Sequence, residues 1–505
     1  MGLEHFDVLI LGAGLSGIDA AHHLQKHCPQ KSYVILEQRQ RIGGTWDLFR
    51  YPGIRSDSDM LTMGYSFRPW TNPKAIAPGE DIRNYVTATA RDEGIDRHIR
   101  FSHRVLRASW SSRDAAWTVS ALRQEPGGRE EPVIITCNFL LSCAGYYRYS
   151  AGYLPDFPEI GRFTGRVVHP QAWPEDLDYA GKRVIVIGSG ATAVTLLPAM
   201  AKTAGHVTML QRSPTYIVSM PEQDKITNFL RRFMPAAWAY KLGRWKNVAY
   251  MMYVYQFAQC FPNFVKTGLI KKTSKQLGSE YDVATHFTPR YNPWNQRLCL
   301  VPDGDLFQAI KAGRASVVTD QIERFTEKGI RLQSGEELQA DIIVTATGLV
   351  LQAVGGAELE VDGRHVDLGK TLAYKGVLLS GVPNLASVFG YINASWTLKA
   401  DLICAYVCRL LNLMNRKGAR QVTPRNGREE AVAPFVQKFM PGYIERSVAN
   451  WPKQGAKAPW RVYQNYLRDV WSLKWSPVDN PALEFSSPTE DSAKTGFETA
   501  RQQTA

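Results

Sequence analysis

The sequence has few cysteines, and no two of them have the spacing that redox enzymes use. Seven occur among 505 residues, and no Cys-x-x-Cys motif is present. An odd number argues against a disulfide framework. The missing motif argues against the disulfide reductases, which combine two nucleotide-binding units with a redox dithiol. A reducing, cytoplasmic environment is therefore expected for Cys28, Cys137, Cys143, Cys260, Cys299, Cys404 and Cys408.

Long apolar runs are also missing. No stretch of the sequence is apolar enough to span a bilayer. The chain passes from Met1 almost directly into an apolar run at Phe6, which leaves no room for a signal peptide. A myristoylation signal would need Ser or Thr where Phe6 stands. We therefore expect a cytoplasmic protein.

Acidic residues are outnumbered, since 60 Lys and Arg face 47 Asp and Glu, for a net charge of +13. Residues 218–280 hold ten basic and three acidic residues, and they include the uncharged, aromatic run Asn247–Val265. This excess suits phosphate-bearing cofactors or a peripheral contact with an anionic membrane. Because no nucleic-acid recognition motif accompanies the basic residues, we expect no nucleic-acid partner. We expect no metal site either.

A first dinucleotide-binding signature lies near the start of the chain. The apolar run Phe6–Leu11 leads into Gly12-x-Gly14-x-x-Gly17, then a helical segment and a second strand that ends at Glu37. Such glycines allow a tight turn and bring backbone N–H groups close to a pyrophosphate at the helix N-terminus. A carboxylate twenty residues further on suits a ribose diol. The sequence therefore predicts a strand-turn-helix-strand unit that binds a dinucleotide.

A second signature follows the strand Arg183–Ile187, with Ala193 in the third glycine position. The next strand ends at Gln211, in the place where the first unit has Glu37, and Arg212 follows. Loss of the acid and gain of a guanidinium suit a ribose 2′-phosphate, hence NADPH. A solvated surface arginine is the alternative. The expected contacts of this second dinucleotide are Gly188, Ser189, Gly190, Ala191, Thr192, Arg212 and Ser213.

Between the two signatures stands the motif Phe163-x-Gly165-x-x-x-His169-x-x-x-Trp173-Pro174. With it, the chain resembles the Baeyer-Villiger monooxygenases, flavoproteins that insert one oxygen atom of O2 beside a carbonyl. The related flavin-containing monooxygenases typically end the motif in Tyr or Phe instead. The alternative interpretation is a linker with packed aromatics, in which the histidine is structural and couples domain movement.

Further stretches match the family. Gly44-Thr45-Trp46, followed by Tyr51-Pro-Gly-x-x-x-Asp57, resembles the loop that lies against the flavin ring. In the family this aspartate pairs with an arginine; the alternative is an N-cap for the segment after Ser58.

The segment Tyr291–Leu300 resembles the one that carries the family's active-site arginine, here Arg297. A surface salt bridge is the alternative role for this arginine. Many members have lysine just before it, where this chain has Gln296. Trp396 is expected to open a long helix whose N-terminus points at the flavin.

The resemblance implies a fold and a domain order. We expect an α/β protein with two Rossmann-like domains, for FAD and NADP, and a helical insertion in the NADP domain that covers the active site. Alternating stretches near Trp117 and Val133 predict an antiparallel insertion in the FAD domain. The expected segments are the FAD domain at 1–148 and 349–484, a linker at 149–180, the NADP domain at 181–217 and 294–348, the insertion at 218–293, and a disordered tail at 485–505.

The resemblance also implies a reaction. NADPH would reduce FAD, and reduced flavin would take up O2. The resulting flavin peroxide would convert a ketone to an ester or lactone, with Arg297 supplying positive charge and Asp57 holding it in place. The runs Phe49–Asp57 and Asn393–Lys399 are similar to the subgroup that activates the thioamide ethionamide, so sulfides or thioamides are further substrates. A heteroatom monooxygenase and an NADPH oxidase-like flavoprotein remain alternatives.

Overall fold

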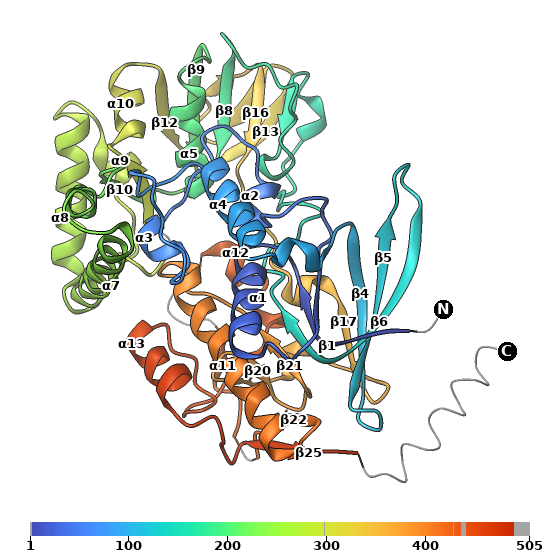
Figure 1. Ribbon diagram of the computed structural model, residues 1–505. Helices are drawn as coiled ribbons and strands as arrows, with labels where there is room; N and C mark the ends of the chain where they lie inside the picture. Colours follow the sequence, from blue (N-terminus) through green and yellow to red (C-terminus); the bar gives the residue numbers. More distant parts are fainter. Residues whose placement is uncertain (1–2, 297, 428, 436–440, 489–505) are drawn as a thin grey trace.

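The computed structural model describes residues 3–296, 298–427, 429–435 and 441–488, arranged around two separate main sheets with helices on their faces (Figure 1). The first sheet has a parallel part in which β2 and the second half of β1 are buried and apolar, as expected where both faces are covered. From one edge inward, β3, β2, β1 and β6 are neighbours, and β21 joins β6 on its other side. These strands are β1 (Glu4–Leu11), β2 (Tyr33–Leu36), β3 (Ile99–Arg100), β6 (Glu130–Ser142) and β21 (Leu385–Ser387).

Two helices that are far apart in the sequence cover one face of this parallel part. They are α1 (Leu15–His27) and α11 (Trp396–Lys417), which pack against each other as well. The first turn of α1 lies so close to the turn after β1 that a Cβ atom on Gly17 would lie 1.9 Å from the carbonyl oxygen of Gly12. Glycine is therefore required at this close approach, and it fixes where the first turn of α1 lies.

The predicted antiparallel insertion of the first domain is confirmed. Strand β5 pairs antiparallel with both β4 and the first half of β6, and β17 and β18 extend the edge beyond β4. The indole rings of Trp110 and Trp117 meet at 5.6 Å between centroids in the core under these strands. The strands are β4 (His103–Ser111), β5 (Ala116–Gln124), β17 (Glu358–Val361) and β18 (Arg364–His365).

The second domain is built on an all-parallel sheet with the order β12-β9-β8-β16-β7. Strand β7 comes from the segment 149–180, so part of the expected linker belongs to this sheet. The strands are β7 (Arg166–Val168), β8 (Arg183–Ile187), β9 (His206–Gln211), β12 (Ala315–Thr319) and β16 (Ile342–Thr345). Helices α5 (Ala191–Met200) and α10 (Asp305–Lys311) pack beside them, and β13 (Ile322–Thr326), β14 (Gly329–Leu332) and β15 (Glu337–Gln339) form a small antiparallel sheet.

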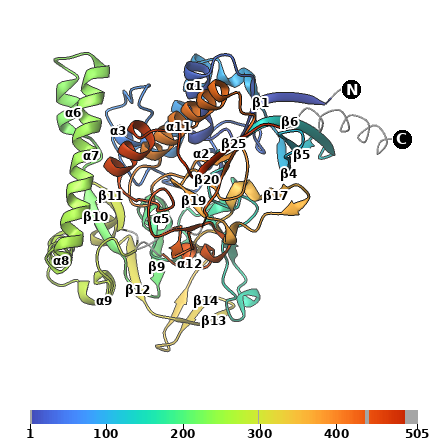
Figure 2. The same cartoon turned by 90° about the horizontal axis from the view of Figure 1, so that it is seen from below.

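Four helices lie within residues 218–293: α6 (Lys225–Leu230), α7 (Ala236–Cys260), α8 (Pro262–Leu277) and α9 (Val283–Phe287). They stand along one side of the molecule (Figures 1 and 2). The start of this segment differs from the helical expectation, because β10 (Tyr216–Met220) pairs in parallel with β11 (Leu298–Pro302). Strand pairing at the base of the insertion brings its entry and its exit together.

A buried arginine fastens the insertion to the first domain. Arg244 of α7 is 8% exposed, and its Nη1 donates to the carbonyl oxygens of Leu61, Thr62 and Gly64 at 3.0, 3.0 and 2.7 Å. Tyr240 OH donates to the carbonyl of Tyr65 at 2.9 Å. Hydrogen bonds from a charged donor are stronger than neutral ones, so this contact holds α7 against the loop around α3 (Met60–Met63).

The remaining elements are short. The helices are α2 (Thr45–Leu48), α4 (Gly79–Asp92), α12 (Gly442–Glu445) and α13 (Tyr466–Asp469). The strands are β19 (Ala373–Tyr374), β20 (Leu378–Leu379), β22 (Gln421–Pro424), β23 (Ala433–Pro434), β24 (Lys453–Gln454) and β25 (Leu483–Ser486). Because β25 pairs with β22, Phe485 and Ser486 belong to a sheet, whereas the expected tail from 489 onward lies outside the described residues. Across the described part of the chain, no helix has the length and apolar character needed to cross a membrane.

Candidate active site

One large cavity, of about 1100 Å³, lies where the two domains meet, and both glycine signatures open onto it. In the first domain, Gly12, Glu37 and Gly145 follow the carboxyl ends of β1, β2 and β6 and line the cavity. In the second domain, Ser189 and Gly190 follow β8 and line it too. Crevices beyond the carboxyl ends of parallel strands are where α/β sheets bind ligands.

The first signature leaves a helix end open for an anion. Gly12 has φ +96°, a left-handed conformation that favours glycine. The N-cap of α1 is Gly14, no side chain caps the helix, and its first turn holds no acid. The N–H groups of that turn are therefore free of the side-chain acceptors that would compete with a phosphate.

Glu37 stands at the far end of this half-site, 3% exposed. Its Oε2 accepts from the N–H of Ala13 at 2.8 Å and its Oε1 from the N–H of Arg39 at 2.9 Å. Burial is the largest influence on this carboxyl and raises its pKa, partly offset by those two bonds. A carboxylate held this way beside the glycine turn suits a ribose diol, so the residues present fit FAD.

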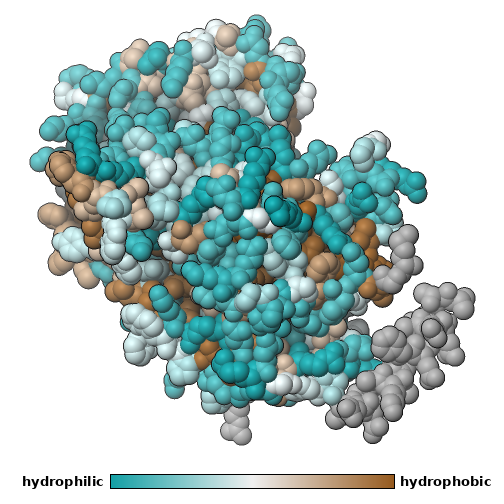
Figure 3. All heavy atoms as spheres, in the orientation of Figure 1, coloured by the Kyte–Doolittle hydropathy of each residue, from teal (hydrophilic) through white to brown (hydrophobic). Residues whose placement is uncertain are grey.

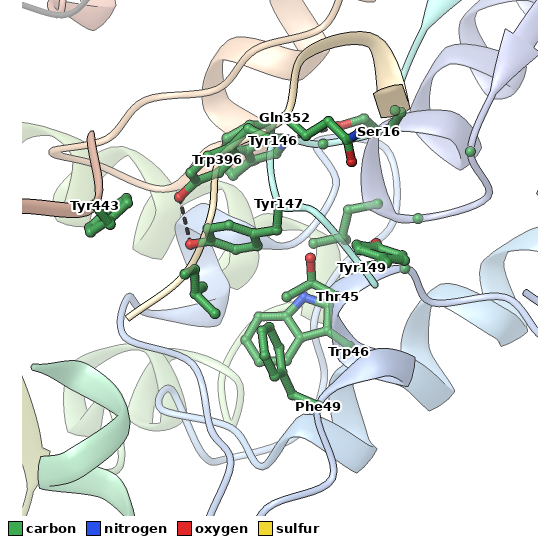
Figure 4. Close-up of a pocket in the computed structure, with 18 of the residues that line it drawn as sticks. Ser16, Thr45, Trp46, Phe49, Tyr146, Tyr147, Tyr149, Gln352, Trp396 and Tyr443 are labelled. Atoms are coloured by element: carbon green, nitrogen blue, oxygen red, sulfur yellow. Dashed lines mark hydrogen bonds between the residues drawn. The ribbon is translucent and has the colours of Figure 1, made fainter. Parts of the chain in front are cut away.

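Aromatic side chains surround the inner part of the cavity (Figure 4). Trp396 donates through Nε1 to Ser16 Oγ at 2.8 Å and stacks on Tyr146 with centroids 5.1 Å apart. Across from them lie Trp46 and Phe49 at the start and end of α2. Because a Cβ on Gly390 would lie 2.4 Å from Trp396 Cδ2, glycine is needed there to seat the indole.

The loop that carries Trp46 is fixed by a buried acid. Asp47 is 1% exposed, and its carboxylate accepts from Arg39 at 2.7 Å and from Arg50 at 2.6 Å. Arg41 and Arg83 lie within 3.3 and 4.0 Å of the same carboxylate. This network, which sequence reasoning missed, holds α2 beside the glycine turn of α1.

A tyrosine cluster was also missed. Tyr146, Tyr147 and Tyr149 follow β6 directly and line the cavity, and Tyr443 joins them from α12. Tyr146 and Tyr147 share a hydrogen bond of 2.7 Å between their hydroxyls. Burial raises the pKa of all three of the residues that follow β6, so their hydroxyls stay protonated as donors. The closely spaced tyrosines directly after a buried strand were the available signal.

The second signature has the same open geometry. Gly188 has φ +133°, and a Cβ there would lie 2.4 Å from the carbonyl oxygen of Ala346. Gly190 is the N-cap of α5, which has neither a side-chain cap nor an acid in its first turn. A Cβ on Gly190 would meet no described atom within 4 Å. Free N–H groups facing open space fit a second pyrophosphate.

Gln211, the last residue of β9, and the two residues that follow it do not line the cavity. Gln211 is buried and donates through Nε2 to the carbonyl of His286 at 2.8 Å and to Thr319 Oγ1 at 2.9 Å. It therefore fastens α9 to the sheet in the place where Glu37 serves the first half-site. Arg212 and Ser213 are exposed, and the carbonyl of Ser213 accepts from Ser189 Oγ at 3.1 Å.

The residues of the central motif have two roles: some pack in the core of the second domain, and His169 lies at the junction between the domains. Phe163 is buried under the second sheet, and a Cβ on Gly165 would lie 2.6 Å from its ring and 2.4 Å from the carbonyl of Asp341. Trp173 and Pro174 are half-buried, and Trp173 meets Tyr179 edge-on. None of these side chains lines the cavity.

His169 forms hydrogen bonds at the point where the chain passes between the two domains. Its Nδ1 accepts from the N–H of Gln171 at 3.2 Å, so Nε2 carries the proton and donates to the carbonyl of Gly348 at 3.3 Å. Burial lowers the pKa of the imidazole, with the bond to Gly348 opposing it. Gly348 lines the cavity, whereas His169 does not. The histidine therefore contacts the site only through the backbone of Gly348, in line with the structural interpretation.

Arg297 lies outside the described residues; Gln296 and Leu300, on either side of it, line the cavity. Asp57 lines the cavity as well. The alternative role of Asp57 as an N-cap is wrong, because Asp59 caps α3 by accepting from the N–H of Thr62 at 3.0 Å.

Of the expected cofactor contacts, those that line the cavity are Gly12, Gly14, Glu37, Gly44, Thr45, Trp46, Tyr51, Asp57, Ser189, Gly190, Ala191, Thr192 and Trp396. Gly17 and Gly188 lie behind that wall, where close backbone packing requires glycine.

The chain belongs to the flavin-binding monooxygenase-like family, whose model matches residues 5–360. Among curated relatives, the FAD-containing monooxygenase EthA of Mycolicibacterium smegmatis is 53% identical over 484 residues, covering 96% of this chain and 97% of the relative. The protein of the same name from Mycobacterium tuberculosis (strain ATCC 25618 / H37Rv) is 55% identical over 485 residues, covering 96% and 98%.

Two solved structures show the same fold. Oxidized steroid monooxygenase bound to NADP is 22% identical, with a TM-score of 0.69 over 84% of this chain and 88% of that one. Cyclohexanone monooxygenase in an open crystal structure is 21% identical, with a TM-score of 0.69 over 84% and 90%. The α/β fold class with two dinucleotide-binding domains is confirmed, and so is the identification as a flavin monooxygenase.

Proposed function

We propose that this protein is an FAD- and NADPH-dependent Baeyer-Villiger monooxygenase that converts ketones to esters or lactones. The observation that carries the proposal is that two open helix N-termini, one from each Rossmann-like unit, face one cavity with an aromatic inner wall. A hydride donor and a flavin must meet for such a reaction, and a shared cavity permits that meeting. The same assignment is supported by two structural neighbours, a steroid monooxygenase bound to NADP and a cyclohexanone monooxygenase.

The first half-site is assigned to FAD. The N–H groups of the first turn of α1 would hold the pyrophosphate, and Glu37 would accept from the ribose. Trp46 and Trp396 would bound the inner space, and a flavin held there and reduced by NADPH would activate O2 for the insertion. The half-buried aromatic wall would help to exclude water from the reacting carbonyl.

The second half-site is assigned to NADPH. The open N-terminus of α5 would hold the pyrophosphate, and Arg212 would pair with the 2′-phosphate, since an exposed guanidinium is unhindered there. Gln211 leaves this end of the site without the carboxylate that would repel the phosphate. Gln296 replaces the lysine that many members place next to the arginine, so more of the selectivity rests on Arg212.

Arg297 and Asp57 are proposed as the reacting pair. Gln296 and Leu300, which flank position 297 in the sequence, line the cavity, and so does Asp57, which supports this proposal. The guanidinium of Arg297 would stabilise negative charge that develops on oxygen during the insertion step, and Asp57 would orient it. The hydroxyls of Tyr146 and Tyr147 are further donors on the same wall.

The substrate class is proposed as a ketone or a sulfur-containing small molecule, with O2 as co-substrate. Aromatic lining suits an apolar molecule. The seven cysteines are free thiols, which supports a reducing, cytoplasmic location.

A peripheral membrane contact is a second proposal about location, and it rests on the insertion. Large apolar side chains of α6, α7 and α8 are exposed, and apolar atoms gather over this side of the surface (Figure 3). The same segment, residues 218–280, holds ten basic and three acidic residues, which suits an anionic lipid surface. The exposed apolar residues are Ile226, Phe229, Phe233, Trp238, Leu242, Trp245, Tyr250, Tyr253, Phe261 and Phe264. Sedimentation with vesicles containing anionic lipid tests it, and binding that is equal for neutral vesicles would contradict the charge argument.

The reaction is tested by incubating FAD-loaded protein with NADPH, O2 and a panel of ketones and thioethers, with product masses measured. Ester formation from a ketone supports the proposal. Sulfoxide formation without any ester would identify a heteroatom monooxygenase, and peroxide release without product would identify an NADPH oxidase. Arg297→Ala should abolish oxygenation while FAD stays bound.

A further inference from the structure

Three ionisable side chains from α1 and α11 meet inside the first domain, behind the wall of the cavity. Asp19 and His23 are one turn apart on α1, and Asp401 comes from α11. His23 Nε2 lies 3.0 Å from Asp401 Oδ1 and 3.7 Å from Asp19 Oδ1. One potential ligand atom of each lies within 4.8 Å of the others. We call Asp19, His23 and Asp401 the helix-pair cluster.

Asp19 is the unusual member. It is 0% exposed, and among the described residues neither of its carboxylate oxygens has a hydrogen-bond partner. A buried carboxylate is normally paired with a cation or with several donors, because leaving water is costly for a charge. Burial, followed by the nearby charge of Asp401, raises the pKa of Asp19 to about 8.

The cationic side chains near Asp19 do not donate a hydrogen bond to its carboxylate, and the nearest, His23 Nε2, lies 3.7 Å from Oδ1. Arg244 influences both carboxylates, but its Nη1 donates to three main-chain carbonyls of the loop around α3. His23 Nε2 is nearer to Asp401 than to Asp19. Asp19 therefore lies in the cluster with no hydrogen bond from a described N–H or O–H group, and its remaining neighbours are the His23 imidazole and the Cys404 thiol.

We propose that the helix-pair cluster binds one divalent metal ion of the zinc type, through an oxygen of Asp19, His23 Nε2 and an oxygen of Asp401. Ligand atoms around tetrahedral zinc, at bond lengths of about 2 Å, lie about 3.3 Å apart. The separations of 3.0, 3.7 and at most 4.8 Å need only small side-chain rotations to match. An imidazole among the ligands favours zinc over Mg²⁺ and Ca²⁺, which prefer oxygen alone.

The surroundings suit such an ion. The Cys404 thiol lies close enough to Asp19 to influence its carboxyl, so a fourth, soft donor is at hand on α11. The side chain of Asp401 is 21% exposed and accepts from Ser66 Oγ at 2.9 Å at the solvent side. This edge gives an ion a way into a cluster that is otherwise closed.

A metal ion here would tie together two helices whose first turns form the cavity wall. Ser16, one turn before Asp19, accepts from Trp396 Nε1, which lies five residues before Asp401. Both Ser16 and Trp396 line the cavity. The metal would thus have a structural role: by linking α1 to α11, it would keep the Trp396 indole in position against the glycine turn.

The test uses the FAD-loaded, full-length protein in a Cys260→Ser background, which removes the one exposed thiol among the described cysteines. After chelation and desalting, zinc is added in slight excess, unbound metal is removed, and the metal per chain and the thermal midpoint are measured. We expect one zinc per chain and a midpoint raised by several degrees. Asp19→Asn should lose both effects, whereas Asp92→Asn, on the exposed end of α4, should retain them.

Two outcomes would overturn the inference. One is the absence of retained zinc and of any shift in the wild type, with Asp19→Asn raising the midpoint because the buried carboxyl holds only a proton. The other is equal zinc retention in the Asp19→Asn and Asp401→Asn variants, which would place the ion elsewhere. Retained FAD in each variant checks that the domain has folded. These readouts do not involve ketone oxidation, so they stand apart from the proposed reaction.

Discussion

Substituting Gly17 by alanine should displace the first turn of α1 and weaken FAD binding. The added Cβ would lie 1.9 Å from the carbonyl oxygen of Gly12 and 3.0 Å from its carbon. Carbon and carbonyl oxygen rarely approach closer than about 3.3 Å, so α1 and the turn at Gly12 must separate by more than about 1 Å. Neither partner is the end of a flexible side chain, because both are backbone. The helix must therefore move as a unit.

The consequence for binding follows from the hydrogen bonds at that helix end. Each charge-assisted bond to a phosphate contributes about 1.5–3 kcal/mol, and weakening even one should raise the dissociation constant of FAD about tenfold or more. Overpacking should also cost about 1–3 kcal/mol of folding stability. Flavin absorbance after gel filtration measures FAD content, and flavin titration of the apoprotein gives the dissociation constant.

A matched control exists in α8. Gly268 is exposed within that helix, and a Cβ there would meet no described atom within 4 Å. Gly268→Ala should leave FAD binding unchanged and stabilise the helix slightly. Wild-type FAD affinity in Gly17→Ala would refute the claim that this close approach sets the position of the glycine turn.

Three other substitutions probe separate contacts. Arg212→Ser should lower the preference for NADPH over NADH at least tenfold in kcat/KM, because a charged hydrogen bond of about 1.5–3 kcal/mol is lost. An unchanged ratio would show that Arg212 does not bind the 2′-phosphate. Burial lowers the pKa of His169, so the folded state resists protonation and stability should be lost as pH falls below the unfolded pKa of about 6.5. His169→Asn should flatten that part of the profile of thermal midpoint against pH, and an equally steep profile would contradict the neutral form. Arg244→Met leaves three buried carbonyls without their donor, and each should reduce the free energy of unfolding by at most about 1–3 kcal/mol. Calorimetry should show a lower thermal midpoint for Arg244→Met than for Arg244→Lys. Equal midpoints would show that the guanidinium group is not needed.

Motifs that rest on local geometry were readable from the sequence. Gly12 and Gly188 have positive φ in turns whose preceding strand and following helix are neighbours along the chain. Glu37 and Gln211 stand at equivalent strand ends for the same reason. Short-range steric rules therefore predicted both dinucleotide units before any tertiary contact was known.

Position within a motif did not reveal what each side chain contacts. Phe163 and Gly165 belong to a family marker, yet they pack under the second sheet, and His169 reaches the site only through Gly348. Asp59 rather than Asp57 caps α3, because the helix begins two residues later than the capping alternative requires. Such details depend on where a turn ends, and the pattern of residue types leaves that open by a residue or two.

By itself, the sequence determined the fold class, the two dinucleotide units and the family, because these follow from glycine spacing, strand character and contiguous motifs. Only the tertiary structure decided which distant residues share an environment. Asp19 and Asp401 are separated by most of the chain, and they meet because α1 and α11 pack on the same face of one sheet. Tyr146 and Tyr443 likewise share the cavity wall only because the chain returns to the first domain. Contacts of this kind arise from packing between helices and sheets, which no local pattern of residues encodes.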